Sequence, residues 1–157
     1  MSLSDWTLRA AQAADADALA ALYLNARRTF LPYAPLAHDD EAVRQWLAAH
    51  RLPAGGVIVA ERAGAVRGFV ACVQQDGQWW IDHLYLHPDE VGQGLGSALL
   101  QHALVLINAP VRLFTFQANG PARRFYERHG FVAIAFSDGS GNEERCPDVL
   151  YAYHPSP

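Results

Sequence analysis

The sequence predicts an α/β (α+β) fold, in which a central mixed, mostly antiparallel seven-stranded sheet is flanked by about four helices. Runs with the two-residue period of strands are interspersed with stretches at helical spacing. A strong hairpin signal at Asp76-Gly77 joins two strands near the middle of the chain. The segments do not follow the repeating order of a parallel doubly wound fold, so a mixed sheet with helices on its faces is expected.

The first third of the chain predicts one strand and two helices. Residues 6–9 are expected to form a strand. Asp15 is expected to cap a helix that extends over 16–28. After a loop broken by prolines, a second helix is expected over 40–50, with its apolar side chains facing inward.

Three antiparallel strands are expected next, over 57–61, 66–74 and 79–86. A turn at Gly64 joins the first two, and the Asp76-Gly77 turn joins the last two. The remaining elements are expected in this order: a helix over 94–108, a strand over 112–117, a helix over 122–129 and two strands over 131–136 and 149–153. Gly130 is expected to end the last helix in the left-handed conformation.

Length and composition favour one domain over residues 1–157, since half of the chain is apolar. The net charge of −4 gives no overall attraction for nucleic acid or for an anionic membrane. No apolar run of about 20 residues is present, so no transmembrane helix is expected. Residues 1–5 also lack the pattern that starts a signal peptide.

The two cysteines, Cys72 and Cys146, are too few for a disulfide framework. Both are expected to be free thiols in a reducing compartment, with Cys72 in the core. The sequence therefore predicts a cytoplasmic protein.

The most informative segment, residues 84–100, predicts a strand, a tight glycine loop and the start of a helix. Gly92, Gly94 and Gly96 carry no Cβ, so backbone N–H groups can approach a ligand there. The first N–H groups of a helix have no partner and carry the positive end of its dipole. This arrangement is typical of a site for a pyrophosphate.

The spacing differs from that of a dinucleotide-binding fold. The loop follows the fourth predicted strand instead of the first, and Ser97 breaks the G-x-G-x-x-G pattern. Asn108 stands near the position where an acidic residue would bind the ribose. By itself the loop also fits an ordinary tight turn.

A second segment, residues 119–131, follows a predicted strand and contains a short helix. Together the two segments resemble the GNAT superfamily of acyl-CoA-dependent N-acetyltransferases, whose motifs are R/Q-x-x-G-x-G/A and N-x-x-A-x-x-F-Y-E-x-x-G-F. The order of the predicted elements also fits this family over nearly the whole chain. The matching residues are Gly94 and Gly96 in the first motif and, in the second, Asn119, Ala122, Phe125, Tyr126, Glu127, Gly130 and Phe131.

The resemblance implies acetyl-CoA as a co-substrate. The backbone of Leu84, Tyr85 and Leu86 is then expected to pair with the pantetheine arm. At one position the chain departs from the family, which usually has Arg or Gln where Val91 stands, so a side-chain contact with phosphate is lost. The pyrophosphate is expected to bind the backbone N–H groups of Val91, Gly92, Gln93, Gly94, Leu95, Gly96 and Ser97.

Three further residues are expected to contact the cofactor by the same resemblance. Asn119 and Tyr126 are expected to lie along its chain, and Arg123 to reach the adenosine 3′-phosphate, although a solvated helix face accounts for Arg123 equally well. No metal site is expected, because His83 and His87 lie about 13 Å apart along an extended strand.

The resemblance also implies the catalytic groups. Tyr126 is expected to protonate the leaving thiolate, since a phenol has a suitable pKa. A base on the predicted strand 79–86 would take a proton from the amine. Asp82 is the first candidate and His83, with an ordinary pKa nearer neutrality, the second; a structural role for Asp82 and a water chain are the alternatives. Strict alternation predicts two faces: Trp80, Asp82, Leu84 and Leu86, opposite Ile81, His83 and Tyr85.

By resemblance, the acceptor pocket is expected between residues 27–38 and 138–148. The acidic second loop favours a cationic amine, whereas Arg27 and Arg28 favour a carboxylate on the acceptor, unless these charges are simply solvated. The expected activity is acetyl transfer from acetyl-CoA to a primary amine of a small molecule or peptide, by a monomer or homodimer. The alternative is a non-catalytic acyl-CoA-binding module of the same fold.

Overall fold

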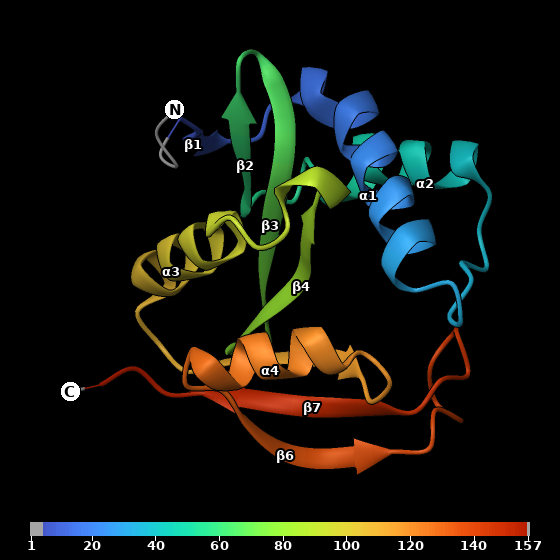
Figure 1. The fold of residues 1–157 in the computed structure, drawn as a ribbon, viewed down its shortest axis with the longest axis vertical. Helices are drawn as coiled ribbons and strands as arrows, with labels where there is room; N and C mark the ends of the chain where they lie inside the picture. Colours follow the sequence, from blue (N-terminus) through green and yellow to red (C-terminus); the bar gives the residue numbers. More distant parts are fainter. Residues whose placement is uncertain (1–4, 157) are drawn as a thin grey trace.

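A computed structural model describes residues 5–156 (Figure 1). Its strands are β1 (Thr7–Ala10), β2 (Val57–Arg62), β3 (Ala65–Gln75), β4 (Gln78–Leu86), β5 (Val111–Phe116), β6 (Val132–Ser137) and β7 (Asp148–Tyr153). Its helices are α1 (Ala16–Phe30), α2 (Asp40–Trp46), α3 (Leu95–Ile107) and α4 (Gly120–Arg128), with short helical turns η1 (Ala13–Asp15), η2 (Leu47–Arg51) and η3 (Pro88–Glu90).

The seven strands form one sheet in the order β1-β2-β3-β4-β5-β7-β6. Every neighbouring pair is antiparallel except β4 and β5. In Figure 1, α3 and α4 lie over one part of the sheet, where α4 runs along β7, and α1 and α2 lie to the other side. The predicted class, a mixed and mostly antiparallel sheet flanked by four helices, is confirmed.

Both predicted hairpin turns are present. Asp76 and Gly77 have φ values of +53° and +78°, and Ala63 and Gly64 have +52° and +80°. Two successive positive φ values match the right-handed twist of the strands that such turns connect. Gly130, with φ of +90°, follows α4 in the left-handed conformation, as predicted.

The start of α1 differs from the prediction, in which Asp15 caps this helix. A single helical turn, η1, precedes α1, and the Asp15 side chain makes no capping bond to α1. Its Oδ2 instead accepts hydrogen bonds from the backbone N–H of Gln12 at 2.7 Å and from Arg9 Nη1 at 2.8 Å. The carboxylate therefore joins β1 to η1, because Arg9 offers it a charged partner.

Two apolar clusters cover the two faces of the sheet. One lies under α3 and α4 and includes Leu95, Leu99 and Tyr151. The other lies under α1 and α2 and includes Leu19 and Phe69. Cys72 lies in the first cluster and both cysteines are free, as predicted.

The strand β4 contains a bulge that changes which side chains share a face. Ala71 of β3 lies opposite His83 and Cys72 lies opposite Ile81, so Asp82 is an extra residue. Ile81 consequently packs toward α3 together with Leu84 and Leu86. Leu84 and Leu86 lie opposite His83 and Tyr85, as predicted, but Ile81 lies on the face opposite to the predicted one, because alternation fails where a strand bulges.

The parallel pair β4 and β5 is short. Only Trp79 with Val111 and Trp80 with Arg112 are paired, and beyond them the two strands diverge. The rest of β4, up to Leu86, has no partner on its β5 side among residues 5–156. An opening through the sheet results, and the candidate site lies there.

Across residues 5–156, the helices are too short or too polar to cross a membrane. The prediction that residues 1–5 do not start a signal peptide concerns a segment that lies mostly outside the described residues.

Candidate active site

The glycine loop between β4 and α3 presents a run of free backbone donors. Gly92 and Gly94 have φ values of +82° and +89°, a conformation that favours glycine, and Gly94 is the N-cap of α3. Among residues 5–156, the N–H groups from Gly92 to Ser97 have no hydrogen-bond acceptor; the first bond of the helix runs from Ala98 to Gly94. Six successive donors at a helix N-terminus suit an anion such as a pyrophosphate.

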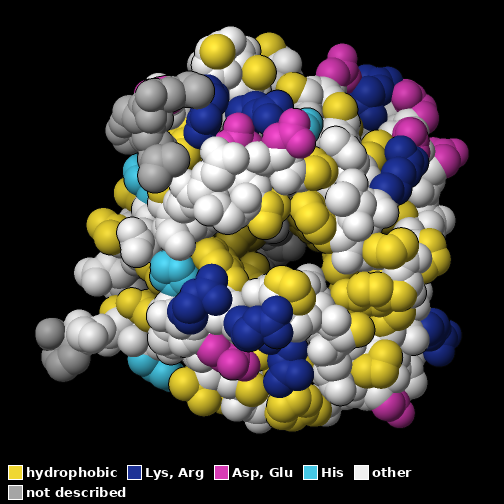
Figure 2. Space-filling model, in the orientation of Figure 1, with side chains coloured by type: hydrophobic (Ala, Val, Ile, Leu, Met, Phe, Trp, Pro, Cys, Tyr) yellow, Lys and Arg dark blue, Asp and Glu magenta, His cyan; other side chains and the backbone are white. Residues whose placement is uncertain are grey.

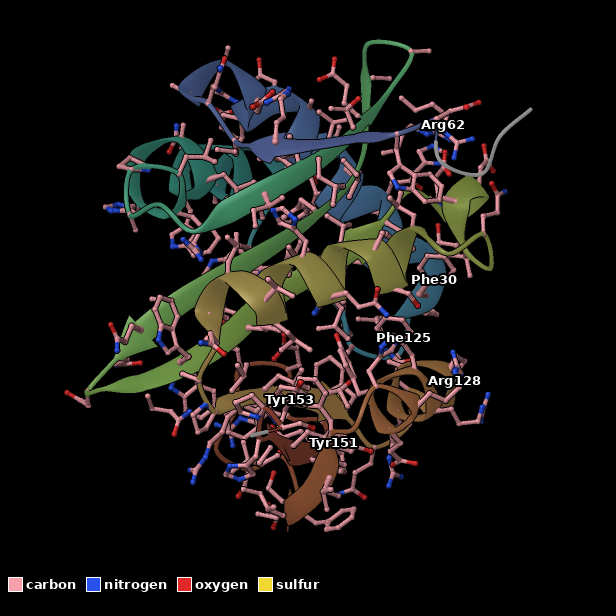
Figure 3. All side chains as sticks on the ribbon, turned by 90° about the vertical axis from the view of Figure 1, so that its left-hand side faces the viewer. Phe30, Arg62, Phe125, Arg128, Tyr151 and Tyr153 are labelled. Atoms are coloured by element: carbon pink, nitrogen blue, oxygen red, sulfur yellow. The ribbon has the colours of Figure 1, made fainter. Side chains whose placement is uncertain are left out.

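Side chains hold the loop in place. Gln93 Nε2 donates to the carbonyl of Asp89 at 2.9 Å, and Ser97 Oγ lies 2.9 Å from His129 Nε2 on the far end of α4. A Cβ at Gly96 would lie 3.5 Å from the Phe125 ring, so the glycine lets α3 approach α4 closely. In Figure 3, Phe125 and Arg128 project from the same side of α4, and the Arg128 guanidinium lies 6.0 Å from the Phe125 ring.

Behind the loop lies a buried ion cluster that the sequence did not reveal. Glu90, only 3% exposed, accepts a hydrogen bond from Arg67 Nε at 2.9 Å and lies 3.2 Å from Arg62 Nη2. Arg62, labelled in Figure 3, also covers the ring of Trp6. The two arginines neutralise a carboxylate that would otherwise repel an anion at the adjacent loop. Glutamate and arginine are ordinary surface residues, so nothing in the local sequence pointed to this cluster.

A cavity of about 110 Å³ lies where β4 and β5 diverge. Figure 2 shows a hollow near the centre of this face of the molecule. The cavity connects the two faces of the sheet, because Tyr126 and Ala122 of α4 line one end and Leu31 and Phe116 the other. Its remaining lining residues are Ile81, Asp82, His83, Leu84, Tyr85, Leu113, Phe114, Thr115 and Asn119.

Tyr126 is almost fully buried, and its ring packs against Phe125 and Phe131. No hydrogen bond of its hydroxyl to another group is found within the described part of the chain. Burial, and to a smaller extent the neighbouring Tyr85, raises the pKa of the phenol, so it stays protonated at neutral pH. The cavity therefore contains a proton donor that no protein group uses.

Asn119 lines the same cavity and caps α4, with its Oδ1 accepting from the N–H of Ala122 at 3.3 Å. Arg123 does not line the cavity. Its Nε donates to Tyr151 Oη at 3.0 Å, and its guanidinium lies over the ring of Phe136. Contact between Arg123 and an adenosine 3′-phosphate stays a prediction, which this placement between α4 and the sheet does not favour.

Asp82 is held by an arginine from η2. Arg51 Nε donates to Oδ2 at 2.7 Å and Nη2 donates to Oδ1 at 3.0 Å. Asp82 lines the cavity, but both of its oxygens accept hydrogen bonds from a buried guanidinium. Arg51 therefore fixes the position of this carboxylate at the cavity.

His83 lies among aromatic rings on the α1 side of the sheet. The rings of Tyr23, Trp46, Phe69 and Tyr85 have centroids 5.5 to 6.1 Å away. Burial lowers the pKa of the imidazole, which is therefore neutral at pH 7. Its Nδ1 is buried and finds no hydrogen-bond partner among residues 5–156.

The charges expected to select the acceptor are paired with one another. Arg27, 5% exposed, donates from Nη2 to the carbonyl of Ala34 at 2.8 Å and to Glu144 Oε2 at 3.2 Å. Arg28 pairs with Asp40 in the same way. Arg27 thus joins the loop after α1 to the loop between β6 and β7, so both predicted acceptor segments do meet.

Comparison with known proteins places the chain. The sequence model described as the Acetyltransferase (GNAT) family matches residues 20–131. An uncharacterized N-acetyltransferase of Archaeoglobus fulgidus is 30% identical over 151 residues, covering 87% of this chain and 99% of that protein.

Solved structures resemble this fold over its whole length. Ard1 from Thermoplasma volcanium is 20% identical with a TM-score of 0.78, covering 98% of this chain and 99% of the other. The PaiA N-acetyltransferase from Thermoplasma acidophilum, solved in complex with coenzyme A, is 16% identical with a TM-score of 0.78, covering 99% and 100%. With the glycine loop, the divergent strands and the sequence match in agreement, this chain belongs to the GNAT family and is an N-acetyltransferase.

Proposed function

We propose that this protein transfers the acetyl group of acetyl-CoA to a primary amine of a small molecule or peptide, by direct attack of the amine on the thioester. The observation that carries the proposal is the cavity through the sheet, which Tyr126 lines at one end and which opens toward the α1 side at the other. Two substrates can therefore meet from opposite faces of the sheet.

The cofactor would occupy the α3 and α4 side. The backbone from Leu84 to Leu86 has no strand partner on its β5 side in the described chain, which leaves room for the pantetheine arm. This segment leads through η3 to the free N–H groups at Gly92 to Ser97, which suit the pyrophosphate. Val91 adds no side-chain contact to phosphate, but the donors that matter belong to the backbone.

In the proposed reaction the amine nitrogen attacks the thioester carbonyl carbon, and the carbon–sulfur bond breaks. Tyr126 gives its proton to the leaving sulfur. The amine must also lose a proton. Asp82 and His83 both line the cavity and both stay candidates, with the arrangement favouring His83, because Arg51 occupies both oxygens of Asp82.

The proposal is tested by mixing the protein with acetyl-CoA and a panel of amines, measuring free thiol and identifying products by mass spectrometry. Thiol release that requires an amine, with a product heavier by one acetyl group, is expected. Binding of acetyl-CoA with no thiol release for any amine would instead favour the alternative, a non-catalytic acyl-CoA-binding module. A cytoplasmic location, a monomeric or homodimeric state and the lack of a nucleic-acid or membrane partner stay predictions.

A further inference from the structure

Aromatic side chains gather at the α1 end of the cavity. Val111 and Leu113 of β5 are buried in the cluster under α3 and α4, so alternation directs Phe114 and Phe116 to the opposite face. Both phenylalanines line the cavity, and Phe114 is 57% exposed. Phe114 is therefore open to contact by a ligand at the mouth of the cavity.

Each phenylalanine is supported by a second aromatic ring. Phe114 stacks on Trp80 of β4, with centroids 5.6 Å apart and ring planes 9° apart. Phe116 meets the edge of Tyr33, from the loop after α1, at 6.3 Å. Residues two apart on a strand are about 7 Å apart, so the two pairs present neighbouring aromatic surfaces on one wall.

The charges around this wall do not suit an acceptor that carries a carboxylate. No arginine or lysine lines the cavity within the described residues. Two buried cations lie near this wall and both are already engaged. Arg27 is bound by Glu144 and lies over the ring of Phe116. Arg51 is bound by Asp82. The one acidic side chain in the lining, Asp82, is paired with Arg51, so the lining carries no net positive charge that would attract a carboxylate.

We infer that the acceptor is a primary arylalkylamine: an amine joined by a short apolar arm to an aromatic ring, with no carboxylate beside the amine. The ring would contact Phe114 and Phe116, and the amine would lie toward Asp82 and the thioester. This inference rests on the proposed function and narrows its acceptor class.

The first test compares acceptors. Phenethylamine should be acetylated with a kcat/KM at least tenfold above that of phenylalanine, which adds a carboxylate, and of hexylamine, which lacks the ring. Spermidine and a short peptide complete the panel. Equal or better acetylation of phenylalanine, spermidine or the peptide would overturn the inference while leaving the acetyltransferase activity established.

The second test uses matched variants at saturating acetyl-CoA. Phe114→Ala should raise the KM for phenethylamine about tenfold and change kcat less than threefold. Phe136→Ala is the control, since Phe136 is equally open at 61% exposed but lies over Arg123 on the α4 side. An unchanged KM in Phe114→Ala, or an equal rise in both variants, would contradict the proposed wall.

Calorimetric titration of phenethylamine into the complex with coenzyme A separates the two proposals. Binding that is weakened about tenfold by Phe114→Ala supports the aromatic site even if no amine is acetylated, in which case only the proposed reaction fails. Absence of binding by phenethylamine to the wild-type complex would overturn the aromatic site.

Discussion

Arg51 holds Asp82 through two hydrogen bonds, from Nε to Oδ2 at 2.7 Å and from Nη2 to Oδ1 at 3.0 Å. The same guanidinium donates to the carbonyls of Gly55 at 2.7 Å and Cys72 at 2.9 Å. One arginine thus joins the loop before β2 to β3 and to the bulge of β4. The pair fixes the shape of the strand that lines the cavity.

Asp82→Asn should lower the free energy of unfolding by about 1.5 to 3 kcal/mol, because the buried Arg51 loses its charged partner. Urea unfolding measures the loss, with the exposed Asp17→Asn as the control, expected within about 0.5 kcal/mol of wild type.

The pH dependence of kcat should keep its shape in Asp82→Asn. A profile displaced to higher pH would instead identify Asp82 as the base.

Tyr126→Phe should lower kcat about 10- to 1,000-fold with little change in the affinity for acetyl-CoA. The ring keeps its packing, and only the hydroxyl, which makes no hydrogen bond among residues 5–156, is removed. Steady-state kinetics and thermal shifts with acetyl-CoA measure the two effects. Tyr153→Phe, which removes a hydroxyl on β7 away from the cavity, is the control. Wild-type kcat in Tyr126→Phe, with chemistry shown to limit the rate, would remove Tyr126 from the mechanism.

Gly94→Val should abolish most of the thermal stabilisation by acetyl-CoA, because a branched side chain at φ of +89° disturbs the run of free N–H groups. No protein atom lies within 4 Å of the added Cβ, so the fold need only bear the backbone strain. Gly64→Val carries matched strain at φ of +80°, also with open space, in a hairpin turn away from the loop. It should unfold at a similar temperature but keep the full shift with acetyl-CoA. An undiminished shift in folded Gly94→Val would place the pyrophosphate elsewhere.

His83 should make the protein less stable in mild acid. Burial lowers its pKa in the folded state, so the unfolded chain binds more protons, and stability present above about pH 6.5 is lost as the pH falls. His83→Phe, which suits the surrounding rings, should reduce the loss of unfolding free energy between pH 7.5 and pH 5.5. His102→Gln, at an exposed histidine, should leave this loss of unfolding free energy unchanged. Equal acid sensitivity in wild type and His83→Phe would contradict the burial argument.

Much of the architecture could be predicted because its signals are local. The Asp76-Gly77 and Gly64 turns, the left-handed Gly130 and the glycine loop each depend on backbone conformations that few residues adopt. Periodicity then located the strands and helices between them. The glycine loop and the second motif also identified the family, which the comparisons confirm.

The tertiary structure alone decided which side chains meet. The bulge at Asp82 puts Ile81 on the face opposite to the predicted one, and a bulge depends on pairing with β3, which the sequence of β4 does not record. Arg51 reaches Asp82 across 31 residues, and Arg27 reaches Glu144 across 117. The positions of charged residues in a sequence do not show which residues they pair with, because the pairs form only when packing brings distant segments together. The sequence by itself determined the order of elements and the position of the glycine loop, and the packing determined which charged side chains pair with one another.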